Sequence, residues 1–187
     1  MVKAHWDTEE LIENWTLLPQ ELELVSNKVG ANQIGFAVLL KYFQLMARFP
    51  DSPQEIPFPI ISYIARQLKI PETAYSEYNW QGRSASNHRA SIRQLFGFAP
   101  ATIADGEEMV NWLKAEIIPN EQRIEPITEL VYQRWRELQI EPPTKGRVER
   151  LIRSAIAQHE ADFCQKTLDK REHPILAKRR RKEIFNS

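Results

Sequence analysis

Apolar residues recur at spacings of three and four along most of the chain, and no segment shows the sustained alternation that is typical of strands. With only six glycines among 187 residues, this pattern predicts an all-α fold, a multi-helix bundle. The predicted helices cover residues 8–15, 17–25, 31–49, 59–70, 83–96, 126–140 and 145–163, with a short helix from residue 71 and another that ends at residue 117.

One predicted helix is apolar on most of its circumference. In its segment QIGFAVLLKYFQLMARF the apolar run is interrupted by Lys41, Gln44 and Arg48, so it is too polar and too short for a membrane span. Other helices must surround such a helix to cover its apolar faces. We therefore expect residues 31–49 to form the centre of the fold and expect no contact with a membrane.

Helix caps and prolines divide the chain. Asp7 or Thr8 is the predicted N-cap of the first helix and Thr16 that of the second. Four prolines in FPDSPQEIPFP mark a connection without helix, and EPPT marks a tight turn. The predicted organisation is a first helical unit over residues 1–100, a second over 101–172, and a basic tail or linker over 173–187, which has too little apolar content to fold by itself.

The net charge of zero conceals an uneven distribution. Residues 1–141 hold 13 Lys and Arg against 19 Asp and Glu, whereas residues 142–187 hold 12 against 6. In addition, the run from Tyr78 to Ala104 contains no acidic side chain. An excess of positive charge at one end and a local absence of negative charge both indicate a polyanionic partner.

The helix predicted over residues 83–96 divides into two faces when it is projected at 100° per residue. His88, Ile92, Leu95 and Phe96 share the buried side, and we expect His88 to be a hydrogen-bonded core residue. The opposite side is small, polar and cationic, with no local carboxylate to neutralise its arginines. Such a face suits the major groove of DNA, because Arg binds guanine, Asn and Gln bind adenine, and small residues permit close approach.

The helix predicted over residues 145–163 has the same design. Its buried stripe contains Val148, Leu151, Ile152, Ala155, Ile156 and His159, and arginines at intervals of three line the far side. With the preceding amphipathic helix and the proline turn, it has the proportions of a helix-turn-helix. The alternative is an ordinary solvated surface in which these arginines pair with Glu149 and Glu160.

The sequence offers little for catalysis or for a cofactor. The single cysteine, Cys164, excludes an internal disulfide, and the four histidines are scattered, so we expect no metal site. HEADFC brings His159, Glu160 and Cys164 close in sequence, which falls short of a metal ligand set. There is no Walker-type phosphate loop, no HExxH and no nucleophile elbow. The acidic amino end does not look like a signal peptide, which favours the cytoplasm.

Four ordered segments resemble the amino-terminal region of the Tn-three family of replicative DDE transposases of bacteria. They are LPQELELV, VGANQIGFAVLLKYFQLMARFP, the pair IPFPIISYIARQLKI and YNWQGRSASNHRASIRQLFGF, and ELQIEPPTKGRVERLIRSA. The resemblance implies helix-turn-helix units of the centromere-protein-B type that recognise the terminal inverted repeats of a transposon. It also implies that the catalytic carboxylates lie in a long carboxy-terminal domain outside these residues, so no catalytic residue is expected here, and that the complete transposase self-associates.

The preferred hypothesis is thus sequence-specific binding of double-stranded DNA without enzymatic activity or a cofactor. The alternative is a helical interaction or oligomerisation scaffold whose exposed aromatics, Trp80 and Trp135, contact a partner. The predicted DNA contacts are Arg83, Ser86, Asn87, Arg89, Arg93 and Gln94 on one helix and Lys145, Arg147, Arg150 and Arg153 on the other.

Overall fold

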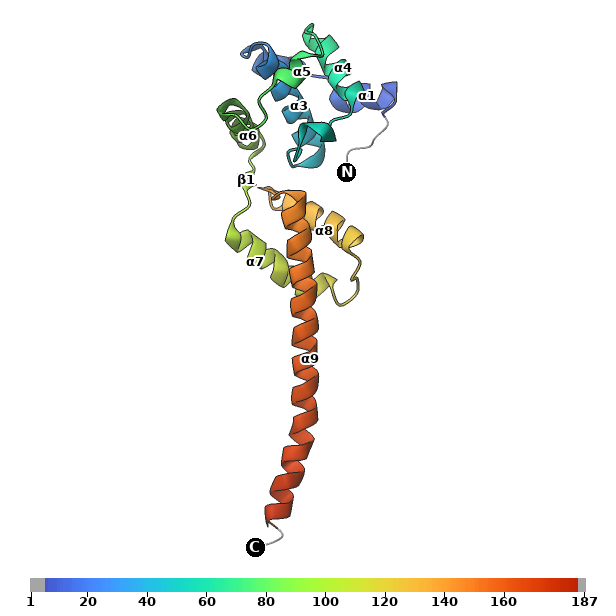
Figure 1. The fold of residues 1–187 in the computed structure, drawn as a ribbon, viewed down its shortest axis with the longest axis vertical. Helices are drawn as coiled ribbons and strands as arrows, with labels where there is room; N and C mark the ends of the chain where they lie inside the picture. The colour runs from blue at the N-terminus through green and yellow to red at the C-terminus, as the bar shows by residue number, and fades with distance from the viewer. Residues whose placement is uncertain (1–5, 185–187) are drawn as a thin grey trace. The chain divides into compact units, whose positions relative to one another are not determined.

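The computed structural model describes the backbone of residues 6–184 and the side chains of residues 6–165, 167 and 168. Helices dominate this part of the chain (Figure 1), and its strands, β1 (Ala99–Pro100) and β2 (Ile140–Glu141), have two residues each. The all-α fold class is therefore confirmed. The chain divides into two compact units, one made of Met1–Pro100 and Trp135–Pro142 and the other of Ala101–Arg134 and Pro143–Ser187.

The first unit opens with α1 (Thr8–Trp15) and α2 (Pro19–Ser26). Asp7 caps α1 as predicted, since its carboxylate accepts a hydrogen bond from the Glu10 N–H at 2.8 Å. The prediction that Thr16 caps α2 is wrong. The Thr16 hydroxyl donates to the Ile12 carbonyl at 2.6 Å, at the end of α1. α2 begins only at Pro19, whose fixed φ and missing N–H suit the first position of a helix.

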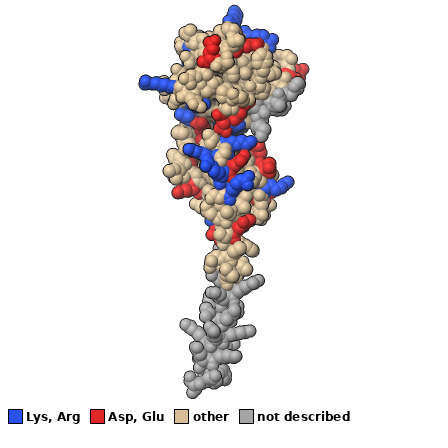
Figure 2. Space-filling model, viewed as in Figure 1, with Lys and Arg blue, Asp and Glu red and all other residues tan. Residues whose placement is uncertain are grey.

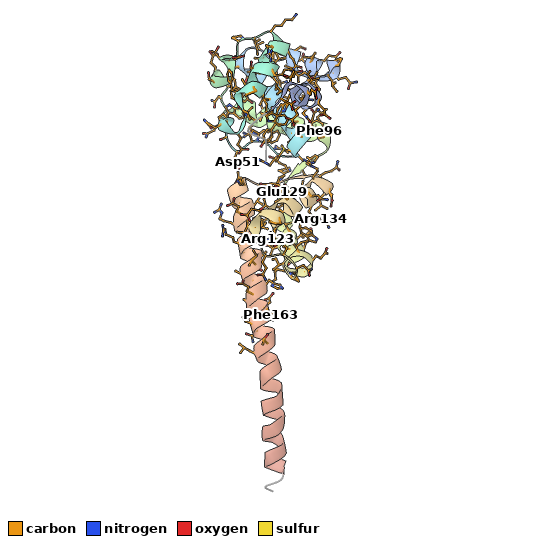
Figure 3. All side chains as sticks on the ribbon, turned by 90° about the vertical axis from the view of Figure 1, so that its right-hand side faces the viewer. Asp51, Phe96, Arg123, Glu129, Arg134 and Phe163 are labelled. Atoms are coloured by element: carbon orange, nitrogen blue, oxygen red, sulfur yellow. The ribbon has the colours of Figure 1, made fainter. Side chains whose placement is uncertain are left out.

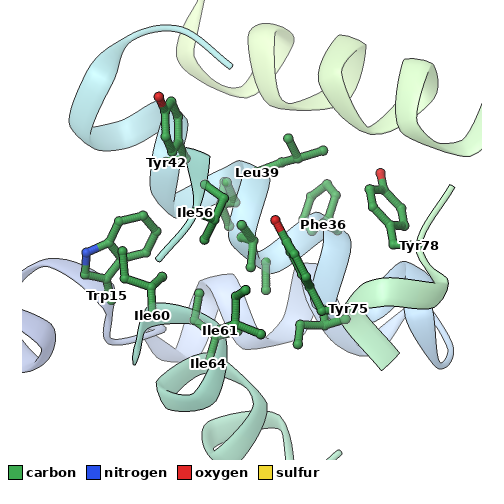
Figure 4. Close-up of a cluster of buried hydrophobic side chains, with 14 of the residues drawn as sticks. Trp15, Phe36, Leu39, Tyr42, Ile56, Ile60, Ile61, Ile64, Tyr75 and Tyr78 are labelled. Atoms are coloured by element: carbon green, nitrogen blue, oxygen red, sulfur yellow. The ribbon is translucent and has the colours of Figure 1, made fainter. Parts of the chain in front are cut away.

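α3 (Ala31–Met46) is the central helix of this unit, as predicted. Ten successive residues, Ile34–Phe43, are buried, and the helix contacts α1, α2, α4, α5 and α6. Figure 4 shows Phe36, Leu39 and Tyr42 of this helix within the apolar cluster. The helix ends three residues before the predicted position because Ala47 has a positive φ of 51° and its N–H donates back to the Phe43 carbonyl.

A buried polar cluster joins α2 to α3 inside this core. Glu21 and Lys41 are each only 7% exposed, and the Lys41 Nζ lies 3.4 Å from Glu21 Oε2. The same carboxylate accepts a hydrogen bond from the Leu18 N–H at 2.7 Å and another from the Gln44 amide. Every charge in the cluster is thus paired and hydrogen-bonded, which is the condition for burying charges at tolerable cost.

α4 (Phe58–Leu68) and α5 (Ala74–Glu77) pack on α3, after a connection that contains the 3₁₀ turn η1 (Pro53–Glu55). One face of α4 is apolar and buried, with Ile60, Ile61 and Ile64 (Figure 4) beside Ala65. The Tyr75 hydroxyl donates to the Pro53 carbonyl at 2.9 Å. This bond ties the proline-rich connection to α5.

The second unit contains α7 (Ile103–Trp112), the π-helical turn η2 (Leu113–Ile117), most of α8 (Ile124–Glu137) and α9 (Lys145–Ile184). Thr102 caps α7, because its hydroxyl accepts from the Asp105 N–H at 3.3 Å while the Asp105 carboxylate accepts from the Thr102 N–H at 2.7 Å. α7 and η2 both pack against α9. The buried residues of this unit are Met109, Leu113, Ile118, Ile127, Val131, Val148, Ile152 and Ala155.

α9 is longer than predicted. It begins directly after Thr144, as expected, but continues beyond residue 163 to Ile184. The added stretch holds four Lys and four Arg, which have high helix propensity even without an apolar face. The side chains of the predicted basic tail, residues 173–187, lie outside the described part of the structure. Within the described residues, no helix has both the length and the apolarity needed to cross a membrane.

Candidate nucleic-acid interface

The acid-free run contains α6 (Arg83–Phe96), whose bounds are those predicted from the sequence. Gly82 precedes it and Gly97 follows it. Gly97 has a φ of 70°, and its N–H donates to the Arg93 and Gln94 carbonyls. A residue other than glycine is strained in this left-handed conformation, so glycine fixes the end of the helix.

The inner face of α6 packs on α3. Ala85 and Ile92 are buried, and the Phe96 ring stacks on Phe43 with centroids 5.8 Å apart. The prediction that Leu95 belongs to this face is wrong, because its side chain is 51% exposed. The contact is centred on Ala85 and Ile92, and Leu95 lies roughly 60° from Ile92 around the helix.

His88 lies at the edge of this inner face; it is hydrogen-bonded, as predicted, but only half-buried. Its Nδ1 lies 2.8 Å from the Tyr78 hydroxyl, and its ring packs edge-on against Phe36 at 5.2 Å. Burial, followed by the charge of Lys28, lowers the pKa of His88 to about 4. Gly35 of α3 makes room for this pair, since a Cβ at that position would collide with the Tyr78 ring.

We expect the stability of the first unit to fall as the pH drops from about 6.5 to about 4. In this window the unfolded chain binds a proton at His88 and the folded chain does not, so acid favours unfolding. Urea denaturation at several pH values measures the effect. The variant His88→Asn keeps an acceptor for Tyr78 but does not titrate, so its stability should vary less with pH in this window. An unchanged pH dependence in the variant would contradict the assignment.

The outer face of α6 is exposed. Four exposed polar side chains share one side of the helix, with Ala90 between them, and are Arg83, Ser86, Asn87 and Gln94. Within the described part of the chain, Arg83 forms no salt bridge. This face therefore combines a free guanidinium with amide side chains and a small residue, as a helix in the major groove requires.

Arg89 and Arg93 lie on one flank of α6 and are half-buried. Arg93 Nη1 is 2.7 Å from Glu141 Oε2, and the Arg89 guanidinium lies 5.8 Å from the centroid of the Phe49 ring. No local carboxylate pairs with these arginines, in line with the sequence, but a carboxylate distant in the sequence neutralises Arg93. The partner was missed because it lies 48 residues away in sequence and reaches α6 only through β2. Burial raises the pKa of Glu141, and the hydrogen bond from Arg93 opposes this effect.

The second predicted surface lies on the first turns of α9, where Figure 2 shows Lys and Arg side chains gathered. Of the predicted stripe, Val148, Ile152 and Ala155 are buried, whereas Leu151, Ile156 and His159 are half-buried. The four exposed cationic side chains are Lys145, Arg147, Arg150 and Arg153. Among the described residues the three arginines form no salt bridge, so the alternative in which they pair with Glu149 and Glu160 is not what the structure contains. The Arg150 Nε donates to the Gly146 carbonyl at 3.2 Å.

The aromatics expected to form a partner surface are not exposed. Trp135 is only 1% exposed, and Trp80 is half-buried with its ring edge-on against Tyr75 and Tyr78 at 5.4 and 5.2 Å. Phe163 is instead an exposed aromatic, at 65%, on the stretch of α9 beyond α7 and α8 (Figure 3). In HEADFC, Cys164 is exposed and His159 half-buried. The described residues contain no cluster of three or more His, Cys, Asp or Glu suited to a metal ion.

Fold and surface together define an all-helical protein with exposed cationic helix faces. The chain belongs to the family described as "Domain of unknown function (DUF4158)", which matches residues 1–155. It is 30% identical over 155 residues to the transposase for transposon Tn3926 from Escherichia coli and 27% identical over 176 residues to the transposase for transposon Tn21 from the same organism. It is 26% identical over 106 residues to the transposase for transposon Tn501 from Pseudomonas aeruginosa.

These matches cover more than half of this chain but only a small part of each transposase. They include 80%, 86% and 56% of this chain but only 15%, 17% and 11% of the three transposases, in the order given. The resemblance to the amino-terminal region of Tn-three family transposases is confirmed. The chain corresponds to a small part of the length of these relatives.

Proposed function

We propose that this chain is the double-stranded DNA-binding part of a bacterial transposase and that it recognises the terminal inverted repeats of its transposon. The observation that carries the proposal is α6, an acid-free helix whose exposed face joins Arg83 to two amide side chains around Ala90. The similarity of the chain to transposases for three transposons supports the same conclusion. Such a protein acts where the bacterial DNA lies, in the cytoplasm.

The proposal assigns different tasks to different side chains. Asn87 and Gln94 contact base edges, and Arg83 and Ser86 contact phosphates, because amides discriminate adenine whereas cations give affinity without discrimination. Arg89 and Arg93 add positive charge on the flank. The second surface contributes Lys145, Arg147, Arg150 and Arg153 as phosphate contacts. Residues 1–100 and 101–172 would form two helix-turn-helix units, with α6 and α9 as their second helices and residues 173–187 as a basic tail.

The test is a titration of fluorescent duplex DNA with the protein at a series of salt concentrations. Each neutralised phosphate should contribute about −0.9 to the slope of log K against log salt concentration. Arg83→Ala should make the slope less steep by about one such contribution. Arg123→Ala, which removes a 76% exposed guanidinium paired with Glu121, is the control and should leave the slope as it is. A wild-type slope near zero would reject DNA binding.

Light scattering separates this function from the scaffold alternative. A DNA-binding module should change its scattering when duplex is added in stoichiometric amount. A scaffold should instead associate with itself as its concentration rises, with or without DNA. The second outcome would favour a self-association surface made of exposed apolar residues such as Phe163.

A further inference from the structure

Glu141 reaches the flank of α6 through a fixed backbone path. β2 pairs in parallel with β1, which follows α6 directly, and the register places Glu141 opposite Pro100. The Ala99 N–H donates to the Gln139 carbonyl at 3.0 Å, and Gln139 has a positive φ of 53°. In the same segment, Arg136 Nη2 donates to the Leu45 carbonyl at the end of α3 at 2.6 Å. The position of Glu141 is therefore set by backbone pairing and does not depend on its side-chain bond alone.

The carboxylate of Glu141 pairs with an arginine of α6. It bonds Arg93 at 2.7 Å, with side chains that are 18% and 23% exposed respectively. The charge of Arg89, one turn earlier on the same flank, also opposes the rise in the pKa of Glu141. The Arg89 Nε is buried and has no hydrogen-bond partner among the described residues. The Glu141 carboxylate thus pairs with Arg93 beside the exposed face of Arg83, Asn87 and Gln94.

We propose that Glu141 determines the specificity of the α6 surface by occupying Arg93, so that a DNA phosphate has to compete with a carboxylate. This inference rests on the proposed function. Affinity for any duplex comes from phosphate contacts, whereas discrimination comes from base contacts. The pairing of Arg93 with Glu141 lowers the affinity for any duplex, and it leaves the base contacts of Asn87 and Gln94 unchanged. An element that disfavours the wrong partner raises the ratio between specific and non-specific binding.

The experiment compares wild type, Glu141→Gln, Arg93→Ala and the double variant in titrations of random-sequence duplex against salt. Glu141→Gln releases Arg93, so its slope should steepen by about 0.9 and its affinity at about 0.1 M salt should rise about 5- to 10-fold. The double variant should not differ in slope from Arg93→Ala. Glu23→Gln, which changes the charge equally on the exposed side of α2, should behave as wild type.

Selection from a random duplex pool supplies the measure of specificity. Wild type should enrich particular sequences more strongly than Glu141→Gln does. If Glu141→Gln keeps the wild-type slope or binds more weakly, Glu141 only supports the fold and the proposal is overturned. If the Glu141→Gln variant loses its far-ultraviolet circular dichroism, the NMR signal of the Arg93 guanidinium in the wild-type protein is the deciding measurement. This signal should shift when duplex is added, because Arg93 leaves Glu141 for a phosphate. An unshifted signal would refute the proposal. Absence of salt-dependent binding in all variants, wild type included, would refute the proposed function itself.

Discussion

Lys41→Met should destabilise the first unit by about 3–5 kcal/mol, the largest effect on stability that we expect from one substitution. Methionine has nearly the shape of lysine, so little packing is lost. What remains is the Glu21 carboxylate, 7% exposed, without its cation. The Leu18 N–H and the Gln44 amide still donate to it, but neither carries a charge. Urea denaturation followed by circular dichroism at neutral pH measures the loss.

A second variant separates this loss of charge pairing from a packing defect. In Glu21→Gln/Lys41→Met no charge is buried, and the new side-chain carbonyl can still accept from the Leu18 N–H. We expect it to be more stable than Lys41→Met alone by about 2 kcal/mol or more. Equal stability of the single and double variants would mean that the ion pair contributes nothing and that lost packing explains the effect.

The parts of the fold that depend on neighbouring residues could be predicted from the sequence. α6 has the predicted bounds because its glycines lie immediately outside both ends of its apolar pattern. α3 is buried on nearly all sides because its sequence has almost no polar face. The Asp7 cap follows from a carboxylate placed three residues before Glu10. Each of these features depends on residues that lie within about one helical turn of one another in the sequence.

The features that were missed depend on tertiary contacts. Leu95 is exposed and Trp135 is buried because the packing direction of each helix selects which side of a broad apolar pattern is covered. Thr16 serves α1 in place of α2 because its hydroxyl also meets the Tyr63 hydroxyl at 2.8 Å, 47 residues away. The pairing of Arg93 with Glu141 requires β1 and β2 to meet. No local pattern carries that information.

For the candidate site, these contacts divide the basic residues of α6 into two kinds. Arg83 lies exposed with Asn87 and Gln94, whereas Arg89 and Arg93 have partners within the fold. Binding of DNA by the flank has to overcome a protein contact, but binding by the exposed face does not. Substitution of Arg93 should therefore affect affinity less than substitution of Arg83, although the sequence presents them as equivalent.

On the first turns of α9, replacing the exposed Arg147, Arg150 and Arg153 with alanine should weaken DNA binding most. Each accounts for one phosphate at most, so the slope against salt should lose about 2.7 and the affinity at about 0.1 M salt should fall about 10²- to 10³-fold. The fold should survive, because the side chains are exposed and form no salt bridge within the described residues. Anisotropy titrations with duplex DNA measure the change. The variant is Arg147→Ala, Arg150→Ala and Arg153→Ala combined.

The matched control replaces the same three arginines with lysine. Lysine keeps the charge and loses the planar fork, so phosphate contacts persist whereas bidentate contacts to guanine do not. If α9 only neutralises phosphates, the lysine variant should retain the wild-type slope and sequence preference. If it loses sequence preference at an unchanged slope, α9 contacts bases and α6 is not the sole reader. A wild-type slope in the alanine variant would place these three arginines outside the interface and leave α6 as the candidate binding helix.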